Sequence, residues 1–134
     1  MTNLYGNLLS LNDMVLKRKE SPLRVKSEAY SVRITNLYHY LLDTRKEKVV
    51  ATQIYRSGTS IGANIAEGQF AQSEADMITK YSIALKEAGE TEYWLNNLFK
   101  TGRIDESGYT SMLNDNTELI KMLVASIKTL RGKQ

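Results

Sequence analysis

Small residues recur one helical turn apart in the segment YRSGTSIGANIAEG (residues 55–68), at Gly58, Gly62 and Ala66. On a helix this spacing makes a smooth stripe, against which a neighbouring helix can lie close to the backbone. Each glycine costs a helix interior roughly 1 kcal/mol relative to alanine, so two of them one turn apart need a packing or functional explanation. We interpret Gly58, Gly62 and Ala66 as a site of close helix packing.

The chain has the size and composition of one globular domain, with 134 residues of which 42% are hydrophobic and 25% charged. No window approaches the ~20 apolar residues that cross a bilayer, and the amino terminus lacks the features of a signal peptide. The chain has no cysteine, which excludes disulfides and thiolate metal sites and is typical of a reducing compartment. We therefore expect a cytoplasmic protein.

An all-α fold is predicted, because there is one proline and no alternating strand pattern. Ser21 followed by Pro22 predicts a helix start, Ser73 and Asp105 are predicted N-caps, and Gly102 is a predicted helix stop. The expected helices cover about residues 22–45, 47–70, 74–101 and 106–130. Short connections between four such helices predict an antiparallel up-down four-helix bundle.

The amino-terminal segment forms an extra arm or short helix in this prediction. Leu4, Leu8, Leu11 and Val15 share one helical face. We assign residues 1–22 to the arm, 23–131 to the bundle and 132–134 to a tail. An apolar stripe outside a complete bundle has to be covered, and two alternatives stay open: the arm packs on a neighbouring subunit or on its own bundle.

Basic residues cluster along a chain whose net charge is +3. The clusters suited to contact with nucleic acid are Lys17, Arg18 and Lys19, and then Arg45, Lys46 and Lys48. A third group lies near the carboxyl end. The alternative is that all of them are solvated helix ends.

Polar residues share faces of the second and third predicted helices: Arg56, Asn64, Glu67, Glu87 and Glu90. One interpretation is a partly buried network that fixes helix register or a subunit contact. Another is a ligand pocket, or a metal site formed by the three glutamates. Di-iron bundles use a Glu-x-x-His motif, and this chain has a single histidine, so we expect no bound metal.

Catalytic motifs are absent from the sequence. His39 falls off the apolar stripe of its helix and has no serine nucleophile near it in sequence, so a hydrolase triad is not expected. No glycine-rich loop follows a strand, which argues against a nucleotide site. Tyr93 and Trp94 suit either core or interface burial or a base-stacking platform. We expect no enzyme activity and no cofactor.

Two longer motifs, SIGANIAEG (residues 60–68) and IALKEAGETEYWL (residues 83–95), resemble the signature of the four-helix-bundle proteins also called 23S rRNA intervening-sequence proteins. The resemblance covers about residues 24–130. It implies a left-handed up-down bundle that assembles as a homopentamer around a central channel, with no known enzymatic activity. A similar accessory protein of diversity-generating retroelements is a basic pentamer that binds nucleic acid and a reverse transcriptase.

Two function classes follow. The first is a non-catalytic oligomer that binds RNA or DNA or serves as an assembly scaffold. Five copies, each with a net charge of +3, would together carry a charge on the order of +15, which attracts phosphates. The second is a small-molecule or metal-binding bundle that uses Glu67, Glu87 and Glu90. Basic clusters on one continuous face of the assembly favour the first class, whereas clusters scattered over it favour neither. An open pocket lined by the three glutamates favours the second class.

Overall fold

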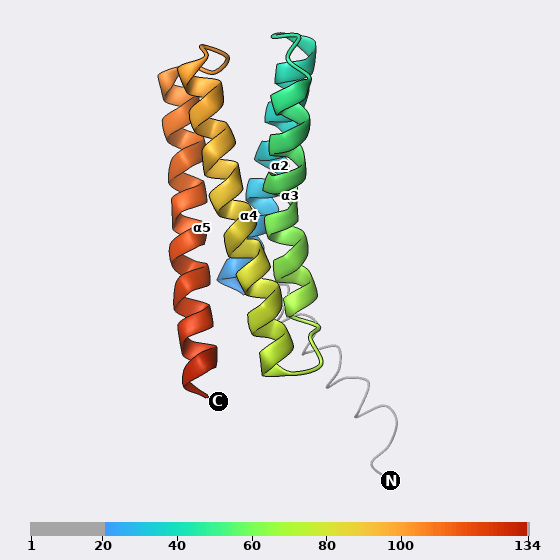
Figure 1. Cartoon of the computed structure of the whole chain (residues 1–134), viewed down its shortest axis with the longest axis vertical. Coiled ribbons are helices and arrows are strands. Elements are labelled where there is room, and N and C mark those ends of the chain that lie inside the picture. Colours follow the sequence, from blue (N-terminus) through green and yellow to red (C-terminus); the bar gives the residue numbers. More distant parts are fainter. Residues whose placement is uncertain (1–20, 134) are drawn as a thin grey trace.

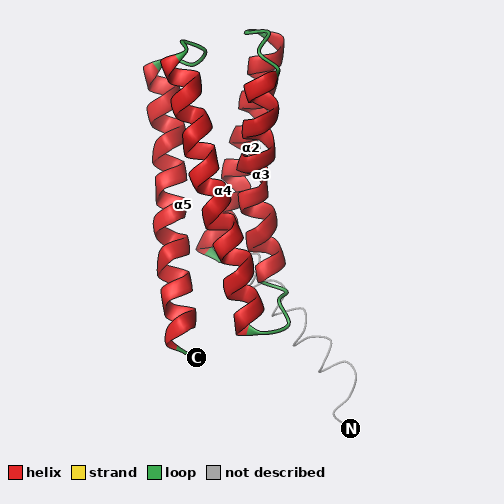
Figure 2. Ribbon diagram, viewed as in Figure 1, coloured by secondary structure: helices red, strands yellow, loops and turns green. Residues whose placement is uncertain are grey.

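Four long helices make up residues 21–133, the part of the chain that the computed structural model describes (Figures 1 and 2). They are α2 (Pro22–Asp43), α3 (Val49–Gly68), α4 (Glu74–Lys100) and α5 (Glu106–Gly132). No strand occurs among these residues, so the all-α prediction is confirmed. Most of the predicted arm lies outside the described part.

Consecutive helices run in opposite directions and pack against each other in chain order, and α2 also contacts α5 to close the bundle. The up-down topology is therefore confirmed. It places the α2–α3 and α4–α5 loops at one end of the bundle, which we call the loop end, while α2 begins and α5 finishes at the other end (Figure 1). No helix within residues 21–133 is long and apolar enough to cross a membrane.

Three of the four helices start at the predicted N-caps. Ser21 Oγ accepts a hydrogen bond from Arg24 N at 3.2 Å, with Pro22 in the first turn. Ser73 Oγ accepts from Asp76 N at 3.1 Å, and Asp105 Oδ1 accepts from Gly108 N at 2.7 Å. These bonds satisfy amide groups that a helix start leaves without partners, which is why the sequence signals mark the boundaries well.

The connection between α2 and α3 is longer than predicted. Helix α2 ends at Asp43 rather than Arg45, and α3 begins at Val49 rather than Glu47. Lys46 takes a φ of 55°, which neither helix can contain. The Glu47 carboxylate then accepts a hydrogen bond from Val50 N at 2.7 Å and caps α3 from outside the helix. At its other end α3 stops at Gly68, two residues before the predicted end.

The small-residue stripe of α3 lies against α2. A Cβ on Gly58 would stand 2.7 Å from two side-chain carbons of Ile34, and one on Gly62 would stand 3.3 Å from the carbonyl oxygen of Ser27. Ala66 follows one turn later and is half-buried. The two glycines thus let α2 approach the α3 backbone more closely than larger side chains permit.

The core consists of the predicted apolar seams, and the largest fully buried apolar side chains belong to all four helices: Tyr30, Ile34, Leu41, Ile54, Ile61, Ile65, Leu95, Leu98, Leu119 and Leu123. A polar layer crosses this core. Thr91 Oγ1 donates to Ser57 Oγ at 2.9 Å, and Asn116 Nδ2 donates to the Ala88 carbonyl oxygen at 2.9 Å. Such buried bonds hold neighbouring helices in one register.

Candidate functional site

Arg56 joins two of the predicted polar residues across the α3–α4 interface. Its Nη1 lies 3.3 Å from Glu87 Oε2, and its Nη2 pairs with Glu90. The Glu87 side chain is 18% exposed, whereas the Arg56 side chain is 49% exposed. The group is therefore a surface ion-pair cluster with one half-buried carboxylate, in which both glutamates pair with the same guanidinium and the three side chains together keep a net charge of −1.

Asn64 and Glu67 lie outside this cluster. Asn64 Nδ2 donates to Ser60 O at 2.8 Å within its own helix. Glu67 pairs instead with Lys80, at 3.2 Å. No group of three or more acidic or histidine side chains in residues 21–133 is arranged to hold a metal ion. The structure thus separates Glu67 from Glu87 and Glu90, and the pocket of three glutamates does not form.

The loop end brings together cations from two connections. Arg45 Nη2 donates to the Gly102 carbonyl oxygen at 2.9 Å, which ties the α2–α3 loop to the α4–α5 loop. Arg103 Nε lies 3.2 Å from Glu47 Oε2 and makes a second link between the same loops. Exposed lysines surround these contacts: Lys46, Lys48 and Lys100.

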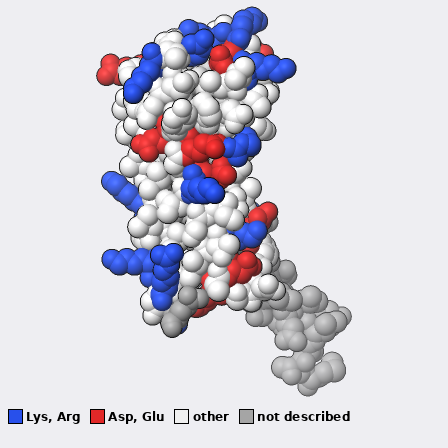
Figure 3. Space-filling model, in the orientation of Figure 1, with Lys and Arg blue, Asp and Glu red and all other residues white. Residues whose placement is uncertain are grey.

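On the face that Figure 3 shows, basic side chains do not form one continuous surface. Figure 3 shows Lys and Arg side chains gathered at the loop end, a mainly acidic band below it, and further basic side chains toward the opposite end. Arg45, Lys46 and Lys48 are all exposed at the loop end. The other predicted contacts, Lys17, Arg18 and Lys19, lie outside the described residues.

An ion-pair network that the sequence analysis missed connects α2 with α5. Lys26 Nζ lies 3.3 Å from Asp115 Oδ1 and 3.0 Å from Glu118 Oε2. Arg33 Nη1 approaches Asp115 Oδ2 to 2.5 Å, and its Nη2 donates to Ser111 Oγ at 2.8 Å. The sequence signal for this network is a pair of basic residues seven apart on α2 and a pair of acidic residues three apart on α5, because each pair shares one face of its helix. These bonds span the interface between the first and last helices of the bundle.

The network shifts the pKa values of its members. Burial raises the pKa of Asp115, but the hydrogen bond from Arg33 and the charge of Lys26 outweigh it, so the net pKa lies below its ordinary value of 3.8. Burial also opposes the charged form of Lys26, and the Glu118 and Asp115 carboxylates together raise the pKa of Lys26 above 10.5. Both shifts favour the charged pair in the folded protein.

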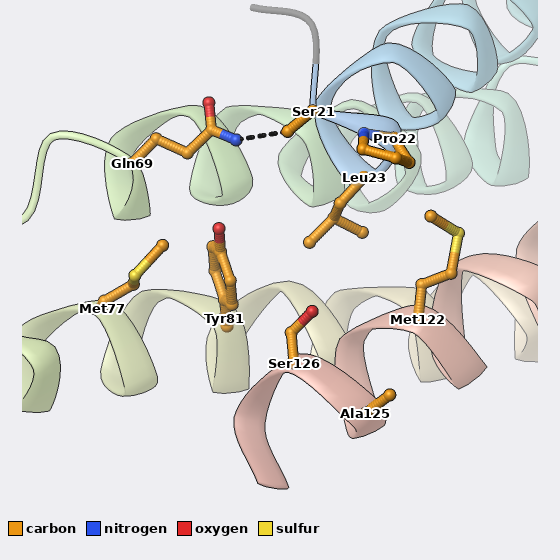
Figure 4. Close-up of a pocket in the computed structure, with 9 residues that line it drawn as sticks. All are labelled: Ser21, Pro22, Leu23, Gln69, Met77, Tyr81, Met122, Ala125 and Ser126. Carbon is orange, nitrogen blue, oxygen red and sulfur yellow. Dashed lines mark hydrogen bonds between the residues drawn. The ribbon is translucent and has the colours of Figure 1, made fainter. Parts of the chain in front are cut away.

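Where α2 begins, residues of α2, α4 and α5 and Gln69, just after α3, line an open, mainly apolar hollow of about 610 Å³, drawn in Figure 4. Its walls are Ser21, Pro22, Leu23, Gln69, Met77, Tyr81, Met122, Ala125 and Ser126. Burial raises the pKa of the Tyr81 hydroxyl, with the Gln69 side chain opposing the shift. Ser21 Oγ accepts a hydrogen bond from Gln69 Nε2 at 2.7 Å on one wall. The hollow has no charged lining residue, so it suits an apolar occupant.

Aromatic side chains lie at several exposed positions. Tyr93 is exposed and its ring meets that of half-buried Trp94 edge-on, with centroids 4.9 Å apart. His39 is exposed, as predicted, and its ring contacts Tyr38 at 5.4 Å. Near the loop end Phe99 stacks on Tyr109 with centroids 4.5 Å apart. The histidine thus adjoins an aromatic ring rather than a nucleophile.

Comparison with known proteins points to one family. Residues 20–125 match the 23S rRNA-intervening sequence protein family, so residues 1–19 precede the match. The chain is also similar to a crystal structure of a protein of unknown function from the S23 ribosomal protein family of Bacteroides thetaiotaomicron VPI-5482. The two are 53% identical with a TM-score of 0.80, over 82% of this chain and 98% of that one. No curated protein matches the chain.

Proposed function

The chain belongs to the 23S rRNA-intervening sequence protein family, and from this premise we propose that it is a non-catalytic oligomer whose loop end binds the phosphate backbone of RNA or DNA. The observation that carries the proposal is the joining of two loops at that end. The Arg45–Gly102 and Arg103–Glu47 contacts hold the basic side chains of both loops together.

Two carboxylates of the loop end already bond to groups within the protein. Glu47 caps α3 and pairs with Arg103, and Asp105 caps α5. Lys46, Lys48 and Lys100 are exposed. Lysines on loops held by hydrogen bonds form a surface suited to phosphate contacts, which dominate sequence-independent affinity for nucleic acid.

We also infer assembly into a homopentamer. The outer face of α2 carries Val25 and Val32, seven residues apart and 52% and 61% exposed. On α4, Tyr93 is 61% exposed. Exposed apolar side chains two turns apart on one face of a surface helix suit a surface that another subunit covers. A ring of five copies would carry a charge on the order of +15, which strengthens attraction to phosphates.

A non-catalytic role suits the chemistry of the described residues. His39 is exposed and packs against Tyr38, and the glutamates nearest to one another, Glu87 and Glu90, share Arg56. We place the protein in the cytoplasm, which suits a chain without cysteine.

The test is a pair of charge-reversal variants with equal changes in net charge. Lys46→Glu/Lys48→Glu alters the loop end, and Lys121→Glu/Lys128→Glu alters exposed lysines of α5 as the control. Binding of a fluorescent RNA hairpin is measured by anisotropy at several salt concentrations. We expect the loop-end variant to bind at least ~10-fold more weakly and to lose about two units of salt slope, because two phosphate contacts disappear.

The control variant should keep most of the affinity. Equal losses in both variants would mean that net charge alone attracts the RNA, and unchanged binding in both would remove the loop end from the interface. Either result would refute the proposal.

A further inference from the structure

A second hollow lies between α4 and α5, which run side by side along the bundle (Figure 1). It measures about 340 Å³, and we call it the α4–α5 groove. Its lining residues come from these two helices alone: Ser82, Leu85, Val124, Ile127, Lys128 and Arg131. The four residues of α5 lie at i, i+3, i+4 and i+7, so they form one stripe about two turns long.

The apolar side chains of the groove are only partly covered. Val124 is 48% exposed, and Leu85 is half-buried. Ile127 is buried and joins the groove to the hydrophobic core. A partner that covers Val124 and Leu85 would gain the free energy of removing their apolar surface from water.

The groove is basic at one end. Because α4 and α5 are antiparallel, Leu85 lies toward the Val124 end of the groove, and Arg131 lies at the other end. Neither Lys128 nor Arg131 makes an ion pair within residues 21–133. Figure 3 shows basic side chains over the part of α5 near its carboxyl end. These cations complement an occupant that carries carboxylates at this end of the groove.

Gly89 extends the face of α4 that lines the groove. It lies seven residues, or about two turns, after Ser82, so the two share one side of the helix. Gly89 is exposed, and a Cβ there would meet no atom within 4 Å. Glycine weakens a helix interior relative to alanine, and no contact among the described residues requires glycine at this position. The missing side chain leaves room for the backbone of a partner to approach α4 closely.

We propose that the α4–α5 groove binds an acidic amphipathic helix of a protein partner. The apolar side chains of that helix cover Leu85 and Val124, its carboxylates pair with Lys128 and Arg131, and its backbone passes over Gly89. A groove between two packed helices suits a third helix, which is a recurring mode of peptide recognition.

The apolar part of the groove favours a protein over a nucleic acid. Phosphates would pair with Lys128 and Arg131 but would leave Val124 and Leu85 uncovered. The inference goes beyond the proposed nucleic-acid binding and does not depend on it, because the basic end of the groove and the loop end lie at opposite ends of α5 (Figure 1). Failure of one proposal leaves the other intact.

The test uses the full chain and three fluorescent peptides of about fourteen residues, or four helical turns. The first has leucines at i, i+4 and i+7 flanked by glutamates, the second has lysines in place of the glutamates, and the third is a scrambled form of the first that has no apolar face. Binding is measured by anisotropy. We expect the acidic amphipathic peptide to bind at least ~10-fold more tightly than either of the others, because it alone combines the apolar face with the complementary charge.

Variants of the chain locate the binding surface. Lys128→Glu/Arg131→Glu should weaken binding of the acidic peptide at least ~10-fold by charge repulsion. Gly89→Leu should weaken it at least ~10-fold by filling the space that the peptide backbone needs, while leaving the fold intact. Lys46→Glu/Lys48→Glu makes the same change in net charge at the loop end and should leave peptide binding unchanged. Thermal unfolding of each variant checks that it is folded.

Three results would overturn the proposal. Equal binding of the acidic peptide and its scrambled form would mean that the groove does not recognise an apolar face. Unchanged binding in Gly89→Leu and Lys128→Glu/Arg131→Glu would place the peptide elsewhere on the protein. A smaller particle mass of Gly89→Leu in light scattering without peptide would show that a second copy of the chain occupies the groove.

Discussion

Replacing Gly58 with alanine puts a methyl group where the Ile34 side chain already lies. The new Cβ would stand 2.7 to 2.8 Å from three Ile34 carbons, and fully buried Ile34 has no solvent into which to turn. Alanine gains about 1 kcal/mol of helix propensity over glycine, while overpacking a full core costs about 1 to 3 kcal/mol. We therefore expect a net change in the free energy of unfolding between about zero and a loss of 2 kcal/mol.

Gly89→Ala is the matched control, because Gly89 is an exposed helix-interior glycine whose Cβ would meet no atom within 4 Å. It should stabilise the protein by about 1 kcal/mol. Both variants receive the same gain in helix propensity, so the difference between them isolates the clash, about 1 to 3 kcal/mol. Urea unfolding followed by circular dichroism measures the free energy of unfolding of both variants. The dependence of that free energy on urea concentration should be the same in both, which shows that the unfolding transition itself is unchanged.

A double-mutant cycle with Ile34→Ala identifies the partner. Removing the buried Ile34 side chain costs about 2 to 5 kcal/mol by itself, but it also clears the space that the Gly58→Ala methyl group enters. The two changes should therefore couple favourably by about 1 to 3 kcal/mol. If they are additive, or if Gly58→Ala stabilises as much as Gly89→Ala, α2 does not lie against the α3 stripe and the reasoning fails.

Two further predictions concern the ion pairs. The pKa of Asp115 is lowered in the folded state, so its stabilisation is present at neutral pH and is lost as the pH falls through that folded value. The Asp115→Asn variant should therefore have a lower midpoint urea concentration of unfolding than the wild type at pH 7 and the same midpoint near pH 2. A difference between the two midpoints that persists in acid would rule out the ion pair with Arg33 as its cause. Glu87→Ala should cost only about 0.2 to 1 kcal/mol, less at high salt, because its partner Arg56 is half-exposed. A salt-independent loss of about 3 kcal/mol would instead identify a desolvated pair.

Helix starts were predictable because the signal is local. Ser21, Ser73 and Asp105 bond to amides three residues later, within the same few residues that a sequence pattern displays. The start of α3 was predicted two residues early, since its cap comes from Glu47, which precedes the helix. Lys46 takes its positive φ without being a glycine or asparagine, so the sequence carries no conformational signal there.

The polar cluster was predicted only in part, because residue spacing fixes the face of a helix but not the register between two helices. Ser57 of α3 lies opposite Thr91 of α4. Ten residues further along α3, Glu67 lies opposite Lys80, which precedes Thr91 by eleven residues because α4 runs in the opposite direction. Arg56 and Glu67 are therefore about 16 Å apart along the helix. The α3–α4 loop near residues 69–73 sets this register, and counting outward from it would have assigned the partners.

Contacts between the first and last helices were the hardest to predict. The Lys26 and Arg33 bonds to Asp115 join positions more than 80 residues apart, with no shared loop to fix their alignment. The apolar hollow of Figure 4 is lined by residues from distant parts of the chain, and their meeting where α2 begins is a property of the assembled bundle.

The most direct test of nucleic-acid binding by an oligomer is the mass of the wild-type protein in solution, measured by light scattering while structured RNA is added at several salt concentrations. The account predicts a particle near 76 kDa, five times the 15.2 kDa chain, that takes up RNA at low salt and releases it steeply as salt rises. A particle that gains no RNA mass even at low salt would contradict the proposed function.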